Sequence, residues 1–256
     1  PTVDNSAGAG NVPTAGSVKI DGVNSTSALA GTIPATRISA SDTYGFSIVS
    51  FTSNGNAGQT IAHGLDVAPK MVIAKNRATG LWWVYHYSMG NAKYLELSEV
   101  NQAQNATNLW SSTHPSSTVV YSGLNSLAPT SGDKIIMYCW AEKSGYSKFG
   151  SYEGNGGSSD ITITCGFKPA LVMARCIDSA AKWNVFDNTR DTSPVNSTVL
   201  YWDDTNTEGT GGSDEITFES NGFKISGSGA GTNANNQTHI YAAFADTREA
   251  AFWLDQ

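Results

Sequence analysis

The hydrophobic and polar positions of this chain follow the short alternating pattern of β-strands. Beyond Tyr44, short apolar or alternating runs are separated by clusters of Gly, Asn, Ser and Thr. This pattern predicts short strands, and no window keeps a helical period over three turns. The expected strands are residues 46–51, 60–63, 71–75, 82–87, 93–97, 118–121 and 134–141, then 147–152, 160–165, 171–175, 183–186, 198–202, 215–219, 223–225 and 239–245. We therefore expect an all-β fold, an antiparallel β-sandwich or a jelly roll.

The two series of expected strands form an internal repeat. PKMVIAK from Pro69 matches PALVMAR from Pro169, and WWVYH from Trp82 matches WNVFD from Trp183. Each series also closes on a similar run, IMYCWAE and IYAAFAD. Matches in the same order at a nearly constant offset indicate a duplicated module. We expect Trp82 and Trp183 to be core anchors, and Pro69 and Pro169 each to open a strand.

The N-terminal residues 1–43 have a different composition. They contain no aromatic residue and are rich in Gly, Pro and small side chains. Such a segment cannot bury enough apolar surface alone to offset the entropy lost on ordering. It is expected to be an extended arm that lies on another surface, such as a second subunit, or a disordered linker. The repeats then span 44–143 and 144–249, as two sandwiches or one larger jelly roll, with a tail at 250–256.

Composition and charge exclude several classes of protein. The formal net charge is −7 and the 15 basic residues are scattered, which argues against a nucleic-acid surface. The apolar stretches are too short for a membrane helix. The three cysteines lack metal-site spacing, so we expect buried free thiols in a protein made in a reducing cytoplasm. The chain opens at Pro1 with no signal peptide, and we expect a processed protein or a fragment.

Aromatic residues that the repeat does not duplicate are candidates for binding a glycan. Sugars stack their apolar faces on flat rings, and such sites lie on loops that a rigid scaffold holds. Trp is usually mostly buried, so the interpretation we favour is that these rings pack under their own loops or in a subunit contact. The candidates are Trp83, Trp110, Tyr201 and Trp202.

Acidic residues gather in loops of the second repeat. Asp203, Asp204 and Glu208 offer carboxylates that could hydrolyse a glycosidic bond, and Asp203 with Asp204 could bind calcium. Adjacent acids on a Gly-rich loop are more often solvated turn residues, and that is the expectation here. The four histidines lack metal-ligand spacing, and no nucleotide motif precedes a helix. We expect no catalytic residue, no metal and no cofactor.

Three stretches resemble a known family. They are SFTSNGNAGQTIAHGLDVAPKMVIAKN, YCWAEKSGYSKFGSYEGNG, and NGFKISGSGA followed by HIYAAFAD. Together they resemble an uncharacterised repeat family frequent in virion proteins of tailed bacteriophages, including marine and cyanobacterial phages. LAGTIPATRIS is also similar to shaft or linker sequences of phage fibres.

The resemblance implies a non-enzymatic structural protein of the virion, made in the host cytoplasm. The leading expectation is a tail fibre or receptor-binding component that contacts host surface polysaccharide. A capsid decoration or connector protein, whose arm clamps neighbouring subunits, is the alternative. A polysaccharide depolymerase is the alternative of another class. Expected partners are other virion proteins and further copies of the chain, with a trimer preferred by analogy with fibres.

Overall fold

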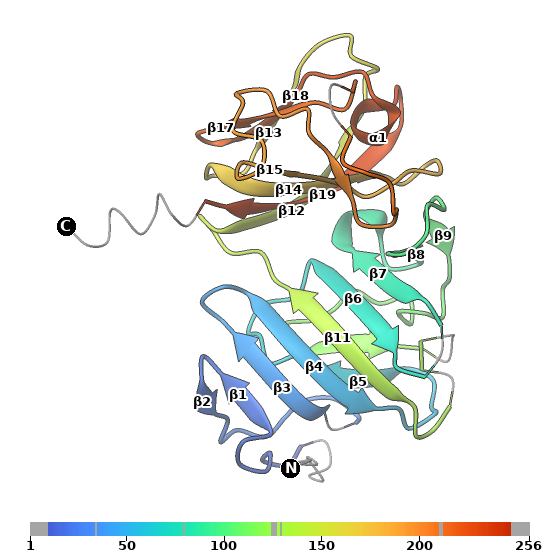
Figure 1. The fold of residues 1–256 in the computed structure, drawn as a ribbon. Coiled ribbons are helices and arrows are strands. Elements are labelled where there is room, and N and C mark those ends of the chain that lie inside the picture. Colours follow the sequence, from blue (N-terminus) through green and yellow to red (C-terminus); the bar gives the residue numbers. More distant parts are fainter. Residues whose placement is uncertain are drawn as a thin grey trace, which may run out of the picture. The chain divides into compact units, whose positions relative to one another are not determined.

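The fold is almost entirely β-sheet. The computed structural model describes residues 10–33, 35–78, 80–123, 127–128, 130–209 and 212–246. It divides into unit 1, Pro1–Glu96 with Gln104–Glu142, and unit 2, Leu97–Ala103 with Lys143–Gln256 (Figure 1). Among the described residues, no helix has the length and apolar character needed to cross a membrane.

Unit 1 contains a large sheet and a two-stranded sheet. The large sheet has the order β2-β1-β3-β4-β11-β6-β7-β8-β9, and the small sheet pairs β10 with β5. A 3₁₀ helix, η1 (Tyr87–Met89), follows β7. The strands are β1 (Val18–Ile20), β2 (Val23–Asn24), β3 (Ala35–Ser41), β4 (Phe46–Thr52), β5 (Gln59–Ala62), β6 (Met71–Asn76), β7 (Trp82–His86), β8 (Lys93–Glu96), β9 (Gln104–Asn105), β10 (Val119–Ser122) and β11 (Lys134–Trp140).

Unit 2 contains a five-stranded sheet and a three-stranded sheet. Their orders are β12-β19-β14-β15-β16 and β13-β18-β17. One short helix, α1 (Ala230–Asn233), precedes the last strand. The strands are β12 (Ser147–Glu153), β13 (Ile161–Thr164), β14 (Pro169–Cys176), β15 (Asn184–Asp187), β16 (Leu200–Tyr201), β17 (Ile216–Glu219), β18 (Gly222–Ile225) and β19 (Thr238–Ala245).

The two units share one strand order, as expected of a duplicated module. The run β4-β11-β6-β7-β8 of unit 1 corresponds to β12-β19-β14-β15-β16 of unit 2, and β5 with β10 corresponds to β13 with β18. The registers agree, because Tyr138 pairs with Ile73 where Ala242 pairs with Met173. At the start of the repeat the register is shifted by one residue from the sequence match: Ser147, rather than Tyr146, is the counterpart of Phe46.

The segment expected to be an extended arm contributes strands to the sheet of unit 1. β3 pairs with β4 in antiparallel fashion, and β1 lies parallel to β3. The apolar residues Val18, Leu29, Ile33 and Ile38 are buried in the core of unit 1. The described part of this segment thus lies on its own chain, because β4 offers it a strand edge for pairing and the core covers its apolar side chains. Residues 1–9 fall outside the described residues.

Each unit has its own core beneath the larger sheet. On β11, Ile135, Met137 and Cys139 are buried, whereas the alternate residues are partly exposed. This period of two gives the sheet an inner and an outer face. In unit 2, Val172, Phe186, Phe223 and Tyr241 lie in the corresponding cluster.

Candidate functional site

Two of the four aromatic candidates are buried in unit 1. Trp83 belongs to the core cluster, and so does Trp110, which is 2% exposed. The ring of Trp110 lies edge-on to that of Tyr85, with 5.8 Å between the ring centroids. Neither ring is available to a glycan at the surface. For Trp110 this is the alternative expected from the sequence, a ring that packs under its own loop.

The sequence predicted the wrong tryptophan of β7 as the core residue. An aromatic shared by both repeats predicts Trp82 in the core, and the period of two would then turn Trp83 to the other face of the strand. In the structure Trp83 points into the core with Tyr85, and Trp82 is only half-buried. Trp183, its counterpart in unit 2, is fully buried. Pro169 opens β14, whereas Pro69 lies two residues before β6.

The other two candidates lie at the surface of unit 2. Tyr201 ends the edge strand β16 and is half-buried, and Trp202 is 48% exposed. The Lys182 Nζ lies 4.3 Å from the centroid of the Tyr201 ring. Tyr201 and Lys182 also line a cavity of about 240 Å³ with Asn184 and Asp214. This cavity combines one aromatic ring with polar groups, as a small sugar site requires.

The acidic candidates are engaged with groups of unit 2. Asp203 Oδ2 lies 3.7 Å from Nη1 of Arg175, both side chains being fully buried, and Asp203 Oδ1 accepts the Trp183 N–H at 3.1 Å. Burial raises the pKa of Asp203, and the Trp183 N–H and the Arg175 charge only partly oppose it. Asp204 is paired with Lys182, whose hydrogen bond lowers the pKa of the Asp204 carboxyl.

Buried Arg175 was not singled out by sequence reasoning, although it stands at the repeat position of Lys75. Its Nη2 donates to the backbone oxygens of Glu99 and Asn101 at 2.7 and 2.6 Å. Its guanidinium carbon lies 5.1 Å from the centroid of the Trp183 ring. A buried cation needs such partners. Arg175 therefore holds residues 97–103 in unit 2, and Asp203 supplies the opposite charge beside it; both roles are structural.

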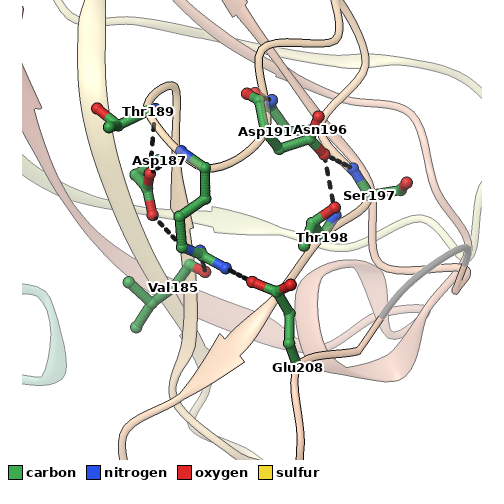
Figure 2. A network of polar contacts seen from close by, with 9 residues as sticks. Val185, Asp187, Thr189, Asp191, Asn196, Ser197, Thr198 and Glu208 are labelled. Carbon is green, nitrogen blue, oxygen red and sulfur yellow. Dashed lines mark hydrogen bonds and ion pairs between the residues drawn. The ribbon is translucent and has the colours of Figure 1, made fainter.

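A second group of carboxylates holds the loop between β15 and β16 (Figure 2). Arg190 pairs with both Asp187 and Glu208. Burial opposes ionisation of Asp187, but hydrogen bonds from Arg190 and Thr189 lower its pKa. The Oδ2 of Asp191 accepts two backbone N–H groups, from Ser197 at 3.0 Å and Thr198 at 3.1 Å.

The acidic candidates of unit 2 have structural partners. Asp203, Asp204 and Glu208 each bind a cation of unit 2, so the structure gives them a role in folding the loops. Within the described ranges, no group of three His, Cys, Asp or Glu side chains is placed to hold a metal ion. The two calcium candidates each have a different cationic partner. Asp203 is buried against Arg175, and Asp204 is paired with Lys182 at the surface.

The structure brings together a set of aromatic side chains that sequence reasoning missed. Four rings lie in a row on the outer face of the large sheet of unit 1, and we call them the aromatic row: Phe46, Trp140, Tyr138 and Trp82. Successive ring centroids are 5.0, 6.4 and 6.2 Å apart. All four side chains are partly exposed. They come from β4, β11 and β7, so a rigid sheet fixes their spacing.

The aromatic row is not duplicated in unit 2. The sheet registers place Ser147 opposite Phe244 where Phe46 lies opposite Trp140, and Ala242 stands at the position of Tyr138. The sequence did hold a signal for the row, since the aromatic residues Tyr138 and Trp140 alternate with Met137 and Cys139, and the repeat gives Tyr138 no aromatic counterpart. The row therefore distinguishes unit 1 from its copy.

Comparison with known proteins gives one family. No curated protein matches the chain. No solved structure matches it. A family model described as "Domain of unknown function (DUF7483)" matches residues 11–248, a range that includes the N-terminal strands of unit 1 and nearly all of unit 2. The chain therefore belongs to the DUF7483 family.

Proposed function

We propose that this protein is a non-enzymatic structural component of a phage particle, a tail fibre or receptor-binding protein. In this proposal it contacts a glycan of the host surface through the aromatic row of unit 1. The likeness of its repeats to virion proteins supports the virion context. The duplicated all-β scaffold supports a role in display, because rigid sheets hold binding groups in fixed positions.

The observation that carries the glycan part of the proposal is the aromatic row. Phe46, Trp140, Tyr138 and Trp82 present partly exposed rings on one face of the sheet. Exposed aromatic groups that gather in one place mark interaction sites more often than scattered ones do. Sugar rings fit such a surface because their C–H faces pack flat against aromatic faces, and a row offers several units in succession.

Unit 2 offers a smaller, second contact in the same proposal. Tyr201 and Trp202 supply rings at the edge of its sheet, and Lys182 and Asn184 supply polar groups beside them. We give this contact the lesser role. The Tyr201 ring is already covered in part by Lys182, and the Nδ2 of Asn184 already donates to two backbone oxygens.

The capsid-clamp alternative is less favoured by the geometry. It needs a free N-terminal segment, whereas β1 and β3 pair within the sheet of unit 1. A trimer stays part of the proposal on analogy with fibres, and size-exclusion chromatography with light scattering measures it.

A glycan array tests the proposal directly. The purified full chain is compared with a Tyr138→Ala/Trp140→Ala variant and with Tyr44→Ala as a control, since Tyr44 is an exposed aromatic outside the row. We expect binding by wild type and by the control, and at least a tenfold loss in the double variant, because two stacking contacts are removed and even a base stacked on an aromatic side chain contributes about 1–3 kcal/mol. Absence of binding by wild type, or equal binding by the double variant, contradicts the proposal. New reducing ends in bound polysaccharide would instead support a depolymerase.

A further inference from the structure

A depression with two cations lies on the outer face of the same sheet. It has a volume of about 490 Å³, and we call it the basic groove. Its polar and apolar lining comes from β1, β3 and β4 and the turn before β1: Ser17, Lys19, Arg37, Ser39, Ile48 and Ser50. Lys19 and Arg37 are both exposed, and no carboxylate lines the groove within the described part of the chain.

The two cations of the basic groove have no acidic partner in the part of the chain that the structure describes. Arg175, Lys182, Arg190 and Lys224 each form an ion pair with Asp or Glu. Among the described residues, neither Lys19 nor Arg37 forms one. In a chain whose formal net charge is −7, two neighbouring cations in a groove that no carboxylate lines form a local positive site, and the nearby Asp21 carboxylate accepts a hydrogen bond from Ser41 beyond the groove lining.

The basic groove and the aromatic row lie on one continuous surface. Lys19 pairs with Ser39, Ser39 with Ile48, and Ile48 with Tyr138, so these four residues form one line across four strands. Residues in register point to the same face of a sheet. Three strand intervals separate Lys19 from Tyr138, which is about 15 Å at the usual strand spacing. A chain of a few sugar units can therefore reach from the cations to the rings.

We infer that this face binds an acidic saccharide, whose carboxylate groups contact Lys19 and Arg37 while its sugar rings stack on the aromatic row. The inference rests on the proposed glycan contact and names its chemical class. Arg binds carboxylates through paired N–H groups, and charge-assisted bonds are stronger than neutral ones. Ser39 is exposed and offers a hydroxyl group along the path.

A saccharide fits this face better than a nucleic acid does. Nucleic-acid surfaces neutralise many closely spaced phosphates with clustered Lys and Arg. The groove has only two cations in its lining, Lys19 and Arg37. The other residues between them and the aromatic row are serine and isoleucine. A polymer with sparse carboxylates and apolar ring faces matches both parts, whereas a dense polyanion meets a chain of net negative charge.

The test uses one saccharide backbone with and without charge. The probes are hyaluronan oligosaccharides, which carry one carboxylate per two sugar units, and their fully methyl-esterified form, titrated calorimetrically into the full chain at low salt. The variants are Lys19→Gln/Arg37→Gln and, as a control with the same charge change, Arg77→Gln/Lys93→Gln, also in unit 1. We expect wild type and control to bind the acid form roughly tenfold or more tightly than the ester, consistent with loss of one charged bond. The groove variant should bind the acid form no more tightly than it binds the ester.

The outcomes separate this inference from the proposed function. Equal affinity of wild type for acid and ester, no affinity for either, or unchanged affinity of the groove variant overturns the acidic-saccharide inference. If the ester still binds and binding is lost in Tyr138→Ala/Trp140→Ala, glycan recognition by the aromatic row stands without it. Added sodium chloride provides a second readout, because it should weaken binding of the acid form selectively.

Discussion

Trp82 and Trp183 hold equivalent positions, yet their side chains lie in different surroundings. Trp82 stacks on Tyr138 at the outer face of unit 1, and Trp183 is buried beside Arg175 in unit 2. The next position differs in kind, since Trp83 fills the core of unit 1 and Asn184 bonds the backbone of unit 2. Duplication thus conserved the strand and its register, while individual side chains took on different tasks.

His63 shows how burial sets the chemistry of a single side chain. The ring follows β5 and is fully buried; its Nδ1 accepts the Leu65 N–H at 3.1 Å, and its Nε2 lies 3.2 Å from the Ser116 oxygen. The ring is therefore neutral, with the proton on Nε2. Burial lowers the pKa of His63 from 6.5 to about 4, although the bond to Ser116 opposes the shift.

Unit 1 should lose stability in acid because of His63. Between pH 6.5 and about 4 the unfolded chain binds a proton that the folded ring does not. The neutral His63 ring therefore makes its full contribution to the free energy of unfolding above pH 6.5. This contribution falls by about 3 kcal/mol in total as the pH drops toward 4. Hydrogen exchange of unit 1 amides at pH 7 and pH 4.5, in wild type and His63→Gln, measures this. The variant should show the smaller drop, and equal drops in both proteins would refute the assignment.

At the scale of elements, the N-terminal strands are part of the fold of unit 1. β3 lies between β1 and β4, and alternate residues of β3 pack into the core. A segment that is polar and Gly-rich on average can do this because only a few apolar residues need burial. The neighbouring strand β4 supplies the backbone hydrogen bonds.

Shortening a buried side chain of β3 should therefore destabilise unit 1. Ile38 is 3% exposed, and Ile38→Ala should lower the free energy of unfolding by about 2–4 kcal/mol through lost burial and the cavity left behind. Val23 is 70% exposed, and Val23→Ala should change it by less than about 0.5 kcal/mol. Hydrogen exchange of unit 1 amides, measured over a series of urea concentrations, gives the free energy of unfolding of each variant and of wild type. A free arm would make the two variants alike.

The strands beyond Tyr44 could be predicted from sequence because alternation and turn residues are local signals. Each range expected to be a strand overlaps one in the structure. β1 and β3 could not be predicted in this way, since their stability comes from pairing with β4 and from the core of unit 1. The placement of Leu97–Ala103 could not be predicted for the same reason. This segment lies within the first repeat in sequence but packs in unit 2, where the buried Arg175 binds its backbone.

At the scale of the whole molecule, the duplicated scaffold carries different surfaces on its two units. Unit 1 presents the aromatic row and the basic groove, and unit 2 presents Tyr201 and Trp202 at a sheet edge. The sequence indicated that unshared aromatics are the ones to consider. It could not show which face each ring takes, because that depends on which side of the sheet the core occupies.

Indole NMR of the full chain tests the central claim, that the aromatic row is the glycan contact. The chain has seven tryptophans, and each indole N–H gives one signal that a Trp→Phe substitution assigns. During titration with a saccharide that binds the chain, the largest shifts should belong to Trp82 and Trp140, while the buried Trp83, Trp110 and Trp183 change little. Largest shifts at Trp202, or none at Trp82 and Trp140, would contradict the account.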